Sequence, residues 1–495
     1  MKRILFIADS IKRKTGYATV ARNIISRLLE TQKFDIGLLG LADIHTQLDL
    51  PISYYTQIKN HKKCCKKGHV VEHRTANDPT IKYITSNIQE PLHSDQKLCL
   101  KGTNENTDNY AYDSIYFVIQ HFKPDIVIPI NDIWGLYNIN YIRNRKCFKF
   151  IPYLAIDSEC MFPGLDIPNG RPGLPGLDTI KTISGANEVI VFTEWAQNVI
   201  NKVFKTVTGR TFDKMSTIPH GVDTKIWKPI ETPKKELKKK FFNIEEDIFL
   251  IGVVARNQPR KKLDAALQTL KKFIDHYEKP GRKAYMYFHC SLDDKMGWPL
   301  DWIAHYYGVR DRCIFDKRLK PGMGPSDEQF NELVNSFDVH MLLTNSEGWG
   351  LPLLETAAAG IPNLTTKYSA HGDWGKDTLM FCKTAELEHE IKTGFIKCIA
   401  DTSSAAKQLS LLYNSKELYK DYCKKGIKLG QKLDWDNVVK QWETFLDNVN
   451  ISDLKENRYS DPSVFPQTND PNDMTLTVFP TVKAPSEDIK GKDDV

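Results

Sequence analysis

The feature that most constrains this chain is an alternation of short apolar runs with helix-like segments, which occurs once in each half. A strand covered on both faces forms a continuous apolar run, and strands that alternate with helices build a parallel sheet. In the first half a helical pattern follows the first run. The first-half runs lie at 2–9, 35–40, 125–130, 149–156 and 188–192. This half is therefore predicted to form a doubly wound, Rossmann-like α/β domain.

A second series of the same kind begins at residue 248. Predicted strands lie at 248–254, 283–288, 338–343 and 361–365, and predicted helices at 261–278, 326–337 and 351–359. Further helices are expected between 402 and 449. The second half is thus predicted to form a second Rossmann-like sheet.

Breaks in these patterns define the expected organisation. Prolines and a run of lysines at 228–242 indicate a linker, which separates a first domain, 1–230, from a second, 231–432. The polar stretch 52–115 is interpreted as an insertion, partly ordered at best. The chain from 450 to 495 is polar and lacks a helical period, so it is expected to be disordered.

Composition narrows the class of protein. The chain has 495 residues and 41% hydrophobic content, which excludes a disordered protein. No apolar run approaches the roughly 20 residues of a membrane-spanning helix, and the N-terminus lacks a signal-peptide cleavage site. Ten scattered cysteines are expected to be free thiols. These features favour a cytoplasmic protein, either free or peripheral to a membrane.

Two further features point to other ligands. Thiols and imidazoles cluster in the insertion and suit zinc by type, but adjacent cysteines are awkward joint ligands and lysines surround them, so no metal site is predicted. This cluster comprises His61, Cys64, Cys65, His69 and His73. Lysine runs at 62–67, 234–240 and 260–262 would suit nucleic acid or anionic lipid, although solvated surface is the simpler interpretation.

The segment 345–355, NSEGWGLPLLE, combines several features of a phosphate-sugar site. An apolar strand runs into a glycine-rich turn, and Pro352 suits the first turn of a helix. Free N–H groups at such a helix start bind anions, and glycine allows a ligand to approach closely. Glu355 could accept hydrogen bonds from ribose hydroxyls, and Glu347 could face a sugar beyond the phosphates.

The segment 256–261, RNQPRK, follows a predicted strand, where ligands bind at the carboxyl edge of a parallel sheet. Arg256 and Lys261 could grip a diphosphate and stabilise the charge that develops when it departs. Singly, each of these features also has an ordinary explanation in surface charge, helix dipoles or turns. Their combination, in this order, favours a functional site.

At these residues the chain resembles the retaining glycosyltransferases of family 4. EGWGLPLLE at 347–355 is similar to the family's pair of glutamates, and VVARNQPRKKLD to its arginine–lysine loop. IPHGVDTKIWKP at 218–229 resembles the segment that closes the first domain, and GYATVARNII at 16–25 its glycine-bearing loop. The helix 433–449 resembles the terminal helix that crosses back to the first domain.

The resemblance implies a GT-B fold: two Rossmann-like α/β domains whose parallel sheets face each other across a cleft. It implies transfer of a sugar, with retention of anomeric configuration, from a UDP- or GDP-linked donor and without an essential metal or other cofactor. The acceptor, whether glycan, lipid, protein or modified DNA, is left open. The implied roles are sugar contact for Glu347, ribose binding for Glu355 and diphosphate binding for Arg256 and Lys261. Donor contacts are also implied for Gly16, Gly348, Gly350 and Leu351.

Two positions depart from the family pattern. Lys262 stands where the family often has glycine, and the first domain offers Asp157 where many members have a histidine near the sugar. Asp157 is therefore a candidate catalytic residue, although a strand-end cap explains it equally well. Two other functions stay open: a nucleotide-sugar epimerase on the same fold, and a non-catalytic protein that binds nucleotide sugars or nucleic acid.

Overall fold

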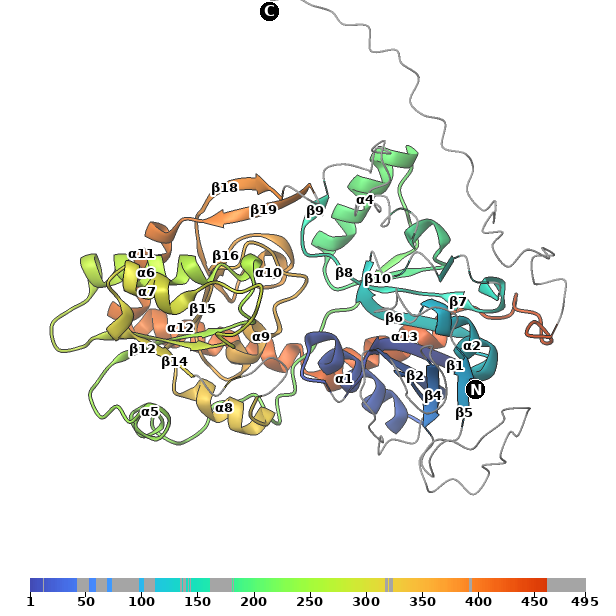
Figure 1. Cartoon of the computed structure of the whole chain (residues 1–495), viewed down its shortest axis with the longest axis horizontal. Coiled ribbons are helices and arrows are strands. Elements are labelled where there is room, and N and C mark those ends of the chain that lie inside the picture. The colour runs from blue at the N-terminus through green and yellow to red at the C-terminus, as the bar shows by residue number, and fades with distance from the viewer. Residues whose placement is uncertain are drawn as a thin grey trace, which may run out of the picture.

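The computed structural model shows two α/β lobes side by side (Figure 1). The first lobe holds residues 1–217 and the second lobe residues 234–432. The residues that the structure describes are 1–11, 13–41, 53–58, 69–73, 98–101, 112–133, 136, 139–140, 142, 144–160, 180, 182–316, 319, 324–390 and 394–460.

The first lobe is built on one sheet whose order is β11-β10-β8-β6-β1-β2-β3-β4-β5, with β7 also paired to β6. Its centre is parallel, as the apolar runs predicted, and α1 (Gly16–Glu30) follows β1 directly. The strands are β1 (Lys2–Asp9), β2 (Phe34–Leu41), β6 (Ile126–Asp132), β7 (Lys149–Phe150), β8 (Tyr153–Ala155), β10 (Val189–Val191) and β11 (Met215–Thr217). The other helices of this lobe include α2 (Tyr112–Phe122) and α4 (Glu194–Thr208).

Two details of this sheet differ from the sequence prediction. The run 149–156 forms two short strands, because Pro152 has no N–H to continue the ladder. Within the polar insertion, the described strands extend the sheet beyond β2 instead of interrupting it. These strands are β3 (Ser53–Ile58), β4 (His69–His73) and β5 (Leu98–Lys101).

The second lobe contains a six-stranded parallel sheet, ordered β14-β13-β12-β15-β16-β17. Its strands are β12 (Phe249–Val254), β13 (Ala284–His289), β14 (Cys313–Phe315), β15 (Val339–Leu342), β16 (Asn363–Thr366) and β17 (Met380–Cys382). Its helices are α5 (Lys234–Phe242), α6 (Leu263–Tyr277), α7 (Leu300–Tyr306), α8 (Asp327–Asn335), α9 (Leu351–Ala358), α10 (Ser369–Trp374), α11 (Thr402–Asn414) and α12 (Lys416–Lys432). The predicted strand–helix series is therefore present.

The lysine-rich segment between the lobes is not only a solvated linker. It forms α5, and the Lys238 ammonium is buried, where it donates to Asp338 at 2.6 Å and to the Ile248 carbonyl at 2.7 Å. Lys234 donates to the carbonyls of Asn335 and Phe337. Two lysines of this run therefore hold α5 on the second lobe, because each finds acceptors that compensate the loss of water.

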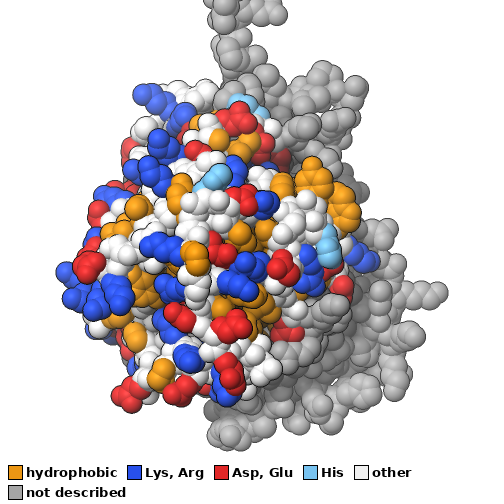
Figure 2. All heavy atoms as spheres, turned by 90° about the vertical axis from the view of Figure 1, so that its left-hand side faces the viewer, with side chains coloured by type: hydrophobic (Ala, Val, Ile, Leu, Met, Phe, Trp, Pro, Cys, Tyr) orange, Lys and Arg blue, Asp and Glu red, His pale blue; other side chains and the backbone are white. Residues whose placement is uncertain are grey.

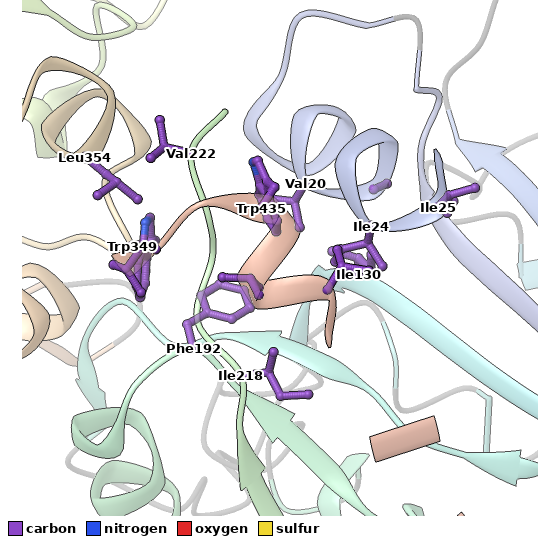
Figure 3. Close-up of a cluster of buried hydrophobic side chains, with 14 of the residues drawn as sticks. Val20, Ile24, Ile25, Ile130, Phe192, Ile218, Val222, Trp349, Leu354 and Trp435 are labelled. Carbon is purple, nitrogen blue, oxygen red and sulfur yellow. The ribbon is translucent and has the colours of Figure 1, made fainter. Parts of the chain in front are cut away.

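The lobes are joined by two chain crossings that pair with each other. Val222 exchanges backbone hydrogen bonds with Leu433 and Trp435, at 2.9 and 3.1 Å. The indole of Trp435 lies over Gly221, where a Cβ atom would come within 2.7 Å of the ring. Figure 3 shows Trp435, Val222, Val20 and Trp349 converging in this buried cluster. The joint is therefore a packed core.

The last helix, α13 (Trp435–Asn448), lies on the first lobe although the chain enters it from the second. Trp442 packs edge-on against Phe6 of β1, with ring centroids 6.5 Å apart. The Lys2 ammonium donates to the carbonyls at the end of this helix, including that of Leu446 at 2.7 Å. These contacts tie the chain's beginning to its last helix.

A small sheet joins the lobes at a second place. The second lobe's hairpin, β18 (Thr384–His389) and β19 (Phe395–Ala400), is antiparallel, and β9 (Glu159–Cys160) of the first lobe pairs with β19. Nearby, the Trp195 N–H donates to Asp373 at 3.0 Å. The lobes therefore share backbone pairing on this side of the molecule.

Residues 451–460, at the start of the segment that was expected to be disordered, pack on the first lobe. The buried Tyr459 hydroxyl donates to the Pro124 carbonyl at 2.6 Å. Arg458 donates to the Cys147 carbonyl at 2.6 Å and also reaches Asp125. One buried aromatic residue with a satisfied hydroxyl anchors a segment that has no helical period. The remaining residues of the tail lie outside the described residues.

Candidate active site

The glycine-rich turn of the second lobe brings free backbone N–H groups to the cleft. Gly350 has φ +88°, a conformation that favours glycine, and α9 starts at the next residue. The N–H groups of Gly350 and Leu351 have no acceptor among the described residues. Since Pro352 carries no N–H, these two donors form the open end of the helix. Such a helix start favours a bound anion.

Glu347 is held at this turn by two cations. Its buried carboxylate accepts from the Lys261 ammonium and, at 3.1 Å, from the Arg260 guanidinium. Burial would raise the pKa of Glu347, but the positive charges of Lys261 and Arg260 outweigh it and lower the pKa to about 2. The carboxylate is therefore ionised and fixed in direction.

The two loops that carry these charges are fastened together. The Arg260 carbonyl accepts from the Asn345 N–H at 2.9 Å and from the Thr344 hydroxyl at 3.0 Å. Burial lowers the pKa of Lys261 to about 8, with the nearby Arg260 charge acting in the same direction. Both cations and the buried Glu347 thus form one polar network, whose members depend on one another.

Arg256, which was predicted to hold the diphosphate together with Lys261, has a partner of its own in the structure. Arg256 is largely exposed and pairs with Asp294 at 2.7 Å, away from the Lys261–Glu347 pair. Arg260 stands with Lys261 instead, and we did not predict this role for it. The signal was available, because Arg260 and Lys261 share one turn of 3₁₀ helix between β12 and α6.

The first lobe offers carboxylates at the carboxyl ends of three neighbouring parallel strands. Asp9 ends β1, Asp132 ends β6, and Asp157 follows β8 by two residues. The Tyr17 hydroxyl donates to Asp132 at 2.6 Å. Burial raises the pKa of Asp132 to about 6, although the Tyr17 hydrogen bond lowers it. Our sequence prediction named Asp157 here but missed Asp132 and Tyr17.

The two groups of residues face each other across the lobes. A Cβ atom on Gly16 would lie 3.7 Å from Leu351, and one on Gly348 would lie 3.3 Å from Ala155. The Arg260 charge lowers the pKa of Asp132, and the Asp157 charge raises the pKa of Arg260, so these groups lie within electrostatic reach of one another. The structure therefore brings together the first-lobe carboxylates, the cations and the turn before α9.

Glu355 lies one turn along α9 and lines a cavity of about 450 Å³ between the lobes. Among the described residues its carboxylate has no hydrogen-bond or ion-pair partner. Burial raises its pKa to about 8, and the nearby Asp327 charge adds to this. The opposite wall of the cavity comes from α1, including Thr19 and Asn23. Glu355 is thus a polar group that faces space for a ligand.

The histidines near these motifs are buried. His220 accepts or donates a hydrogen bond with the Tyr153 hydroxyl at 2.8 Å, and burial lowers its pKa to about 3. His371 is also buried, and its Nδ1 has no partner among the described residues. No group of three or more His, Cys, Asp or Glu side chains in the described ranges is arranged to hold a metal.

Of the zinc candidates, His61, Cys64 and Cys65 lie outside the described residues, while His69 and His73 belong to β4. In the part of the chain that the structure describes, no helix is both long and apolar enough to cross a membrane.

Comparison by sequence finds neither a matching family model nor a matching curated protein. Comparison by structure finds clear matches. Sucrose-phosphate synthase from Thermosynechococcus elongatus is similar with a TM-score of 0.60 and 12% identity, covering 90% of this chain and 98% of that one. Anabaena Alr3699/HepE in complex with UDP-glucose is similar with a TM-score of 0.59 and 13% identity, covering 91% and 100%.

A third match is a point mutant of TarM from S. aureus in complex with Fondaparinux, alpha-GlcNAc-glycerol and UDP. It has a TM-score of 0.58 and 12% identity, covering 90% of this chain and 100% of that one. The whole architecture is therefore shared. The chain has the α/β GT-B fold, with two Rossmann-like lobes and a last helix that returns to the first.

Proposed function

We propose that this protein is a glycosyltransferase that moves a sugar, a hexose by resemblance, from a nucleotide-sugar donor to an acceptor hydroxyl with retention of anomeric configuration. One observation carries the proposal. Lys261 and Arg260 hold an ionised Glu347 beside the free N–H groups before α9, opposite the carboxylates of the first lobe. The glycosyltransferases with the same fold, some of them bound to UDP or UDP-glucose, support it.

The donor is proposed to lie on the second lobe. Its diphosphate sits at the N–H groups of Gly350 and Leu351 and near Lys261, and its ribose hydroxyls meet Glu355. Negative charge grows on the diphosphate as the bond from the sugar carbon to phosphate breaks. Donors and cations already in place stabilise that charge without reorganisation. This arrangement needs no essential metal, so metal-independent transfer is part of the proposal.

The acceptor is proposed to approach from the first lobe. A new bond forms from the acceptor oxygen to the sugar carbon, while the hydroxyl proton leaves toward a carboxylate or the departing phosphate. Asp157 and Asp132 are the candidate proton acceptors on this wall. With a pKa of about 6, Asp132 is mostly ionised at neutral pH, so it can orient an acceptor hydroxyl.

A thermal-shift panel tests the donor site. UDP, GDP, ADP and their glucose conjugates are each added with and without magnesium, and the melting temperature is measured. A ligand that binds only the folded state stabilises it by about 2.7 kcal/mol at 100 times its Kd. We expect one nucleotide to stabilise the protein without magnesium. Absence of any shift would contradict the proposal.

A further inference from the structure

The outer surface of the second lobe carries two aromatic rings on α7 that fold stability does not explain. The side chains of Trp302 and Tyr306 are 65% and 71% exposed. They stand four residues apart, so they share one face of the helix. Their ring centroids are 5.6 Å apart and their planes differ by 15°. The two rings are therefore offset-stacked on each other, and together they form an aromatic platform whose outer faces are left to solvent.

Exposed large apolar side chains are few in the described residues, and they are concentrated here. Of six such residues, three lie within eleven positions of the chain: Met296, Trp302 and Tyr306. The buried face of α7 is supplied by other residues, Leu300 and Ala304. The two rings therefore add nothing to the core, and exposed clusters of this kind mark interaction sites.

The platform also has free polar edges. The Trp302 indole N–H and the Tyr306 hydroxyl have no hydrogen-bond partner among the described residues. On the same helix, Asp301 pairs with Arg310 at 2.5 Å and with the His305 ring at 3.7 Å. A ligand here would meet an apolar surface with hydrogen-bonding groups at its rim.

The charge and the area of this surface argue against two kinds of ligand, anionic lipid and a protein partner. The neighbouring cations are already neutralised, since Arg310 pairs with Asp301 and Arg312 pairs with Glu278 at 2.7 Å. Figure 2 shows this end of the molecule with positive and negative side chains interspersed. Cations that are already paired attract anionic lipid less than free ones do. Two rings are also far smaller than the roughly 800 Å² per partner of a stable protein interface.

We propose that Trp302 and Tyr306 bind a neutral saccharide, outside the cleft between the lobes. One sugar ring lies with its C–H groups on the outer, electron-rich face of the stacked pair, on the Trp302 side. Its hydroxyls accept from the indole N–H and exchange hydrogen bonds with the phenol. Such a site retains a glycan near the enzyme without taking part in bond formation.

Affinity electrophoresis of the full chain in native gels tests this site. The gels contain dextran, soluble starch, laminarin, mannan or hydroxyethyl cellulose, and migration is compared with a polymer-free gel. We expect at least one polymer to retard the protein. Trp302→Ala should weaken that association at least tenfold, Tyr306→Ala should weaken it less, and Trp302→Phe should retain most of it. Leu411→Ala, which removes an exposed apolar side chain on α11, should leave retardation unchanged.

Three results would overturn the proposal: retardation by none of the polymers, equal retardation of Trp302→Ala, or Trp302-dependent binding to phosphatidylglycerol vesicles without retardation by glycans. Lys261→Ala separates this site from the donor site. It should lose nucleotide binding and keep glycan retardation, whereas Trp302→Ala should keep nucleotide-induced stabilisation. If Lys261→Ala abolished retardation, the glycan would lie in the cleft and the platform would be excluded.

Discussion

The two walls of the cleft are built in opposite ways. On the second lobe, two short segments, 256–261 and 345–355, supply cations, a glutamate and free N–H groups, and the charges already compensate one another. On the first lobe, Asp9, Asp132 and Asp157 come from the ends of three separate strands. Asp9 pairs with Arg13 of its own lobe at 3.3 Å, and Asp132 feels the charge of Arg260 on the opposite wall.

This difference assigns different tasks to the two walls. A wall of preplaced cations and N–H groups suits a ligand of constant form and high negative charge, such as a diphosphate. A wall of carboxylates disfavours a phosphorylated ligand and suits hydroxyl donors. Four changes, from the largest expected effect to the smallest, test whether the walls are separate in this way.

Removing the charge of Glu347 should have the largest effect. Glu347→Gln keeps the shape but leaves Lys261 and Arg260 without their buried partner. Donor turnover, measured as UDP or GDP release, should fall about 1000-fold because a preorganised electrostatic group is lost. Loss of one partner from a buried ion pair should also cost about 3 kcal/mol of unfolding free energy.

Glu355→Gln is the matched control for stability. Its carboxylate has no ion pair among the described residues, so the neutral amide should leave the melting temperature nearly unchanged. Equal destabilisation of the two variants would show that the ion pairs of Glu347 do not contribute to the free energy of unfolding.

The second test separates the two cations that the sequence predicted to act together. Lys261→Ala should weaken nucleoside diphosphate binding by roughly 10- to 100-fold, since a charge-assisted hydrogen bond contributes about 1.5–3 kcal/mol. Arg256→Ala should weaken it less than threefold, because Arg256 is exposed and already paired with Asp294. Isothermal titration with UDP and GDP measures both. Similar losses of affinity in the two variants would instead support the joint role expected from the family, and a larger loss in Arg256→Ala would contradict the prediction.

The third test concerns the joint between the walls. Gly221→Ala places a methyl group within 2.7 Å of the Trp435 ring, inside a packed core. Overpacking of this kind costs about 1–3 kcal/mol, measured by urea unfolding. Gly324→Ala is the control, because a Cβ atom there meets nothing within 4 Å. Equal stability of the two variants would mean that the joint is loosely packed.

The last change tests a pH dependence at Asp132. Its folded pKa of about 6 exceeds the unfolded value of 3.8, so the fold favours the protonated form. Its contribution to stability is complete below pH 3.8 and is lost as pH rises to about 6. Asp132→Asn removes this loss, so the variant should gain at most about 3 kcal/mol relative to the parent between about pH 4 and pH 7.5.

Chemical unfolding at both pH values measures that gain. Tyr17→Phe should enlarge the parent's pH dependence, because the Tyr17 hydrogen bond lowers the Asp132 pKa. A gain independent of pH would contradict the burial of Asp132.

The contrast between the walls also explains what the sequence could predict. The second-lobe site could be predicted because its parts are close in sequence: a strand, a glycine turn, Pro352 and two glutamates follow one another. Glu347, Lys261 and the turn before α9 were therefore assigned to one site, and in the structure Lys261 contacts Glu347. Arg256 was assigned by its position in a motif, and no local pattern reveals that Asp294, 38 residues later, binds it.

The first-lobe wall was much harder to predict, because its residues are far apart in sequence and come together only when the chain folds. Asp132 and Tyr17 are 115 residues apart. Tyr17 belongs to the motif at 16–25, but nothing in that motif points to Asp132. The same limit applies to Lys238, whose burial depends on Asp338 one hundred residues away. Tyr459 was missed because a single anchoring residue leaves no period in the sequence.

The pairing of β9 with β19 has a mechanical consequence. Two lobes joined only by a hinge swing apart at the cost of the contacts in their cleft. Here the same swing must also peel one strand from another, so any motion that separates the lobes on this side breaks backbone hydrogen bonds. Opening of the cleft for ligand exchange therefore requires release of the β9–β19 pairing as well as bending at the joint between the lobes.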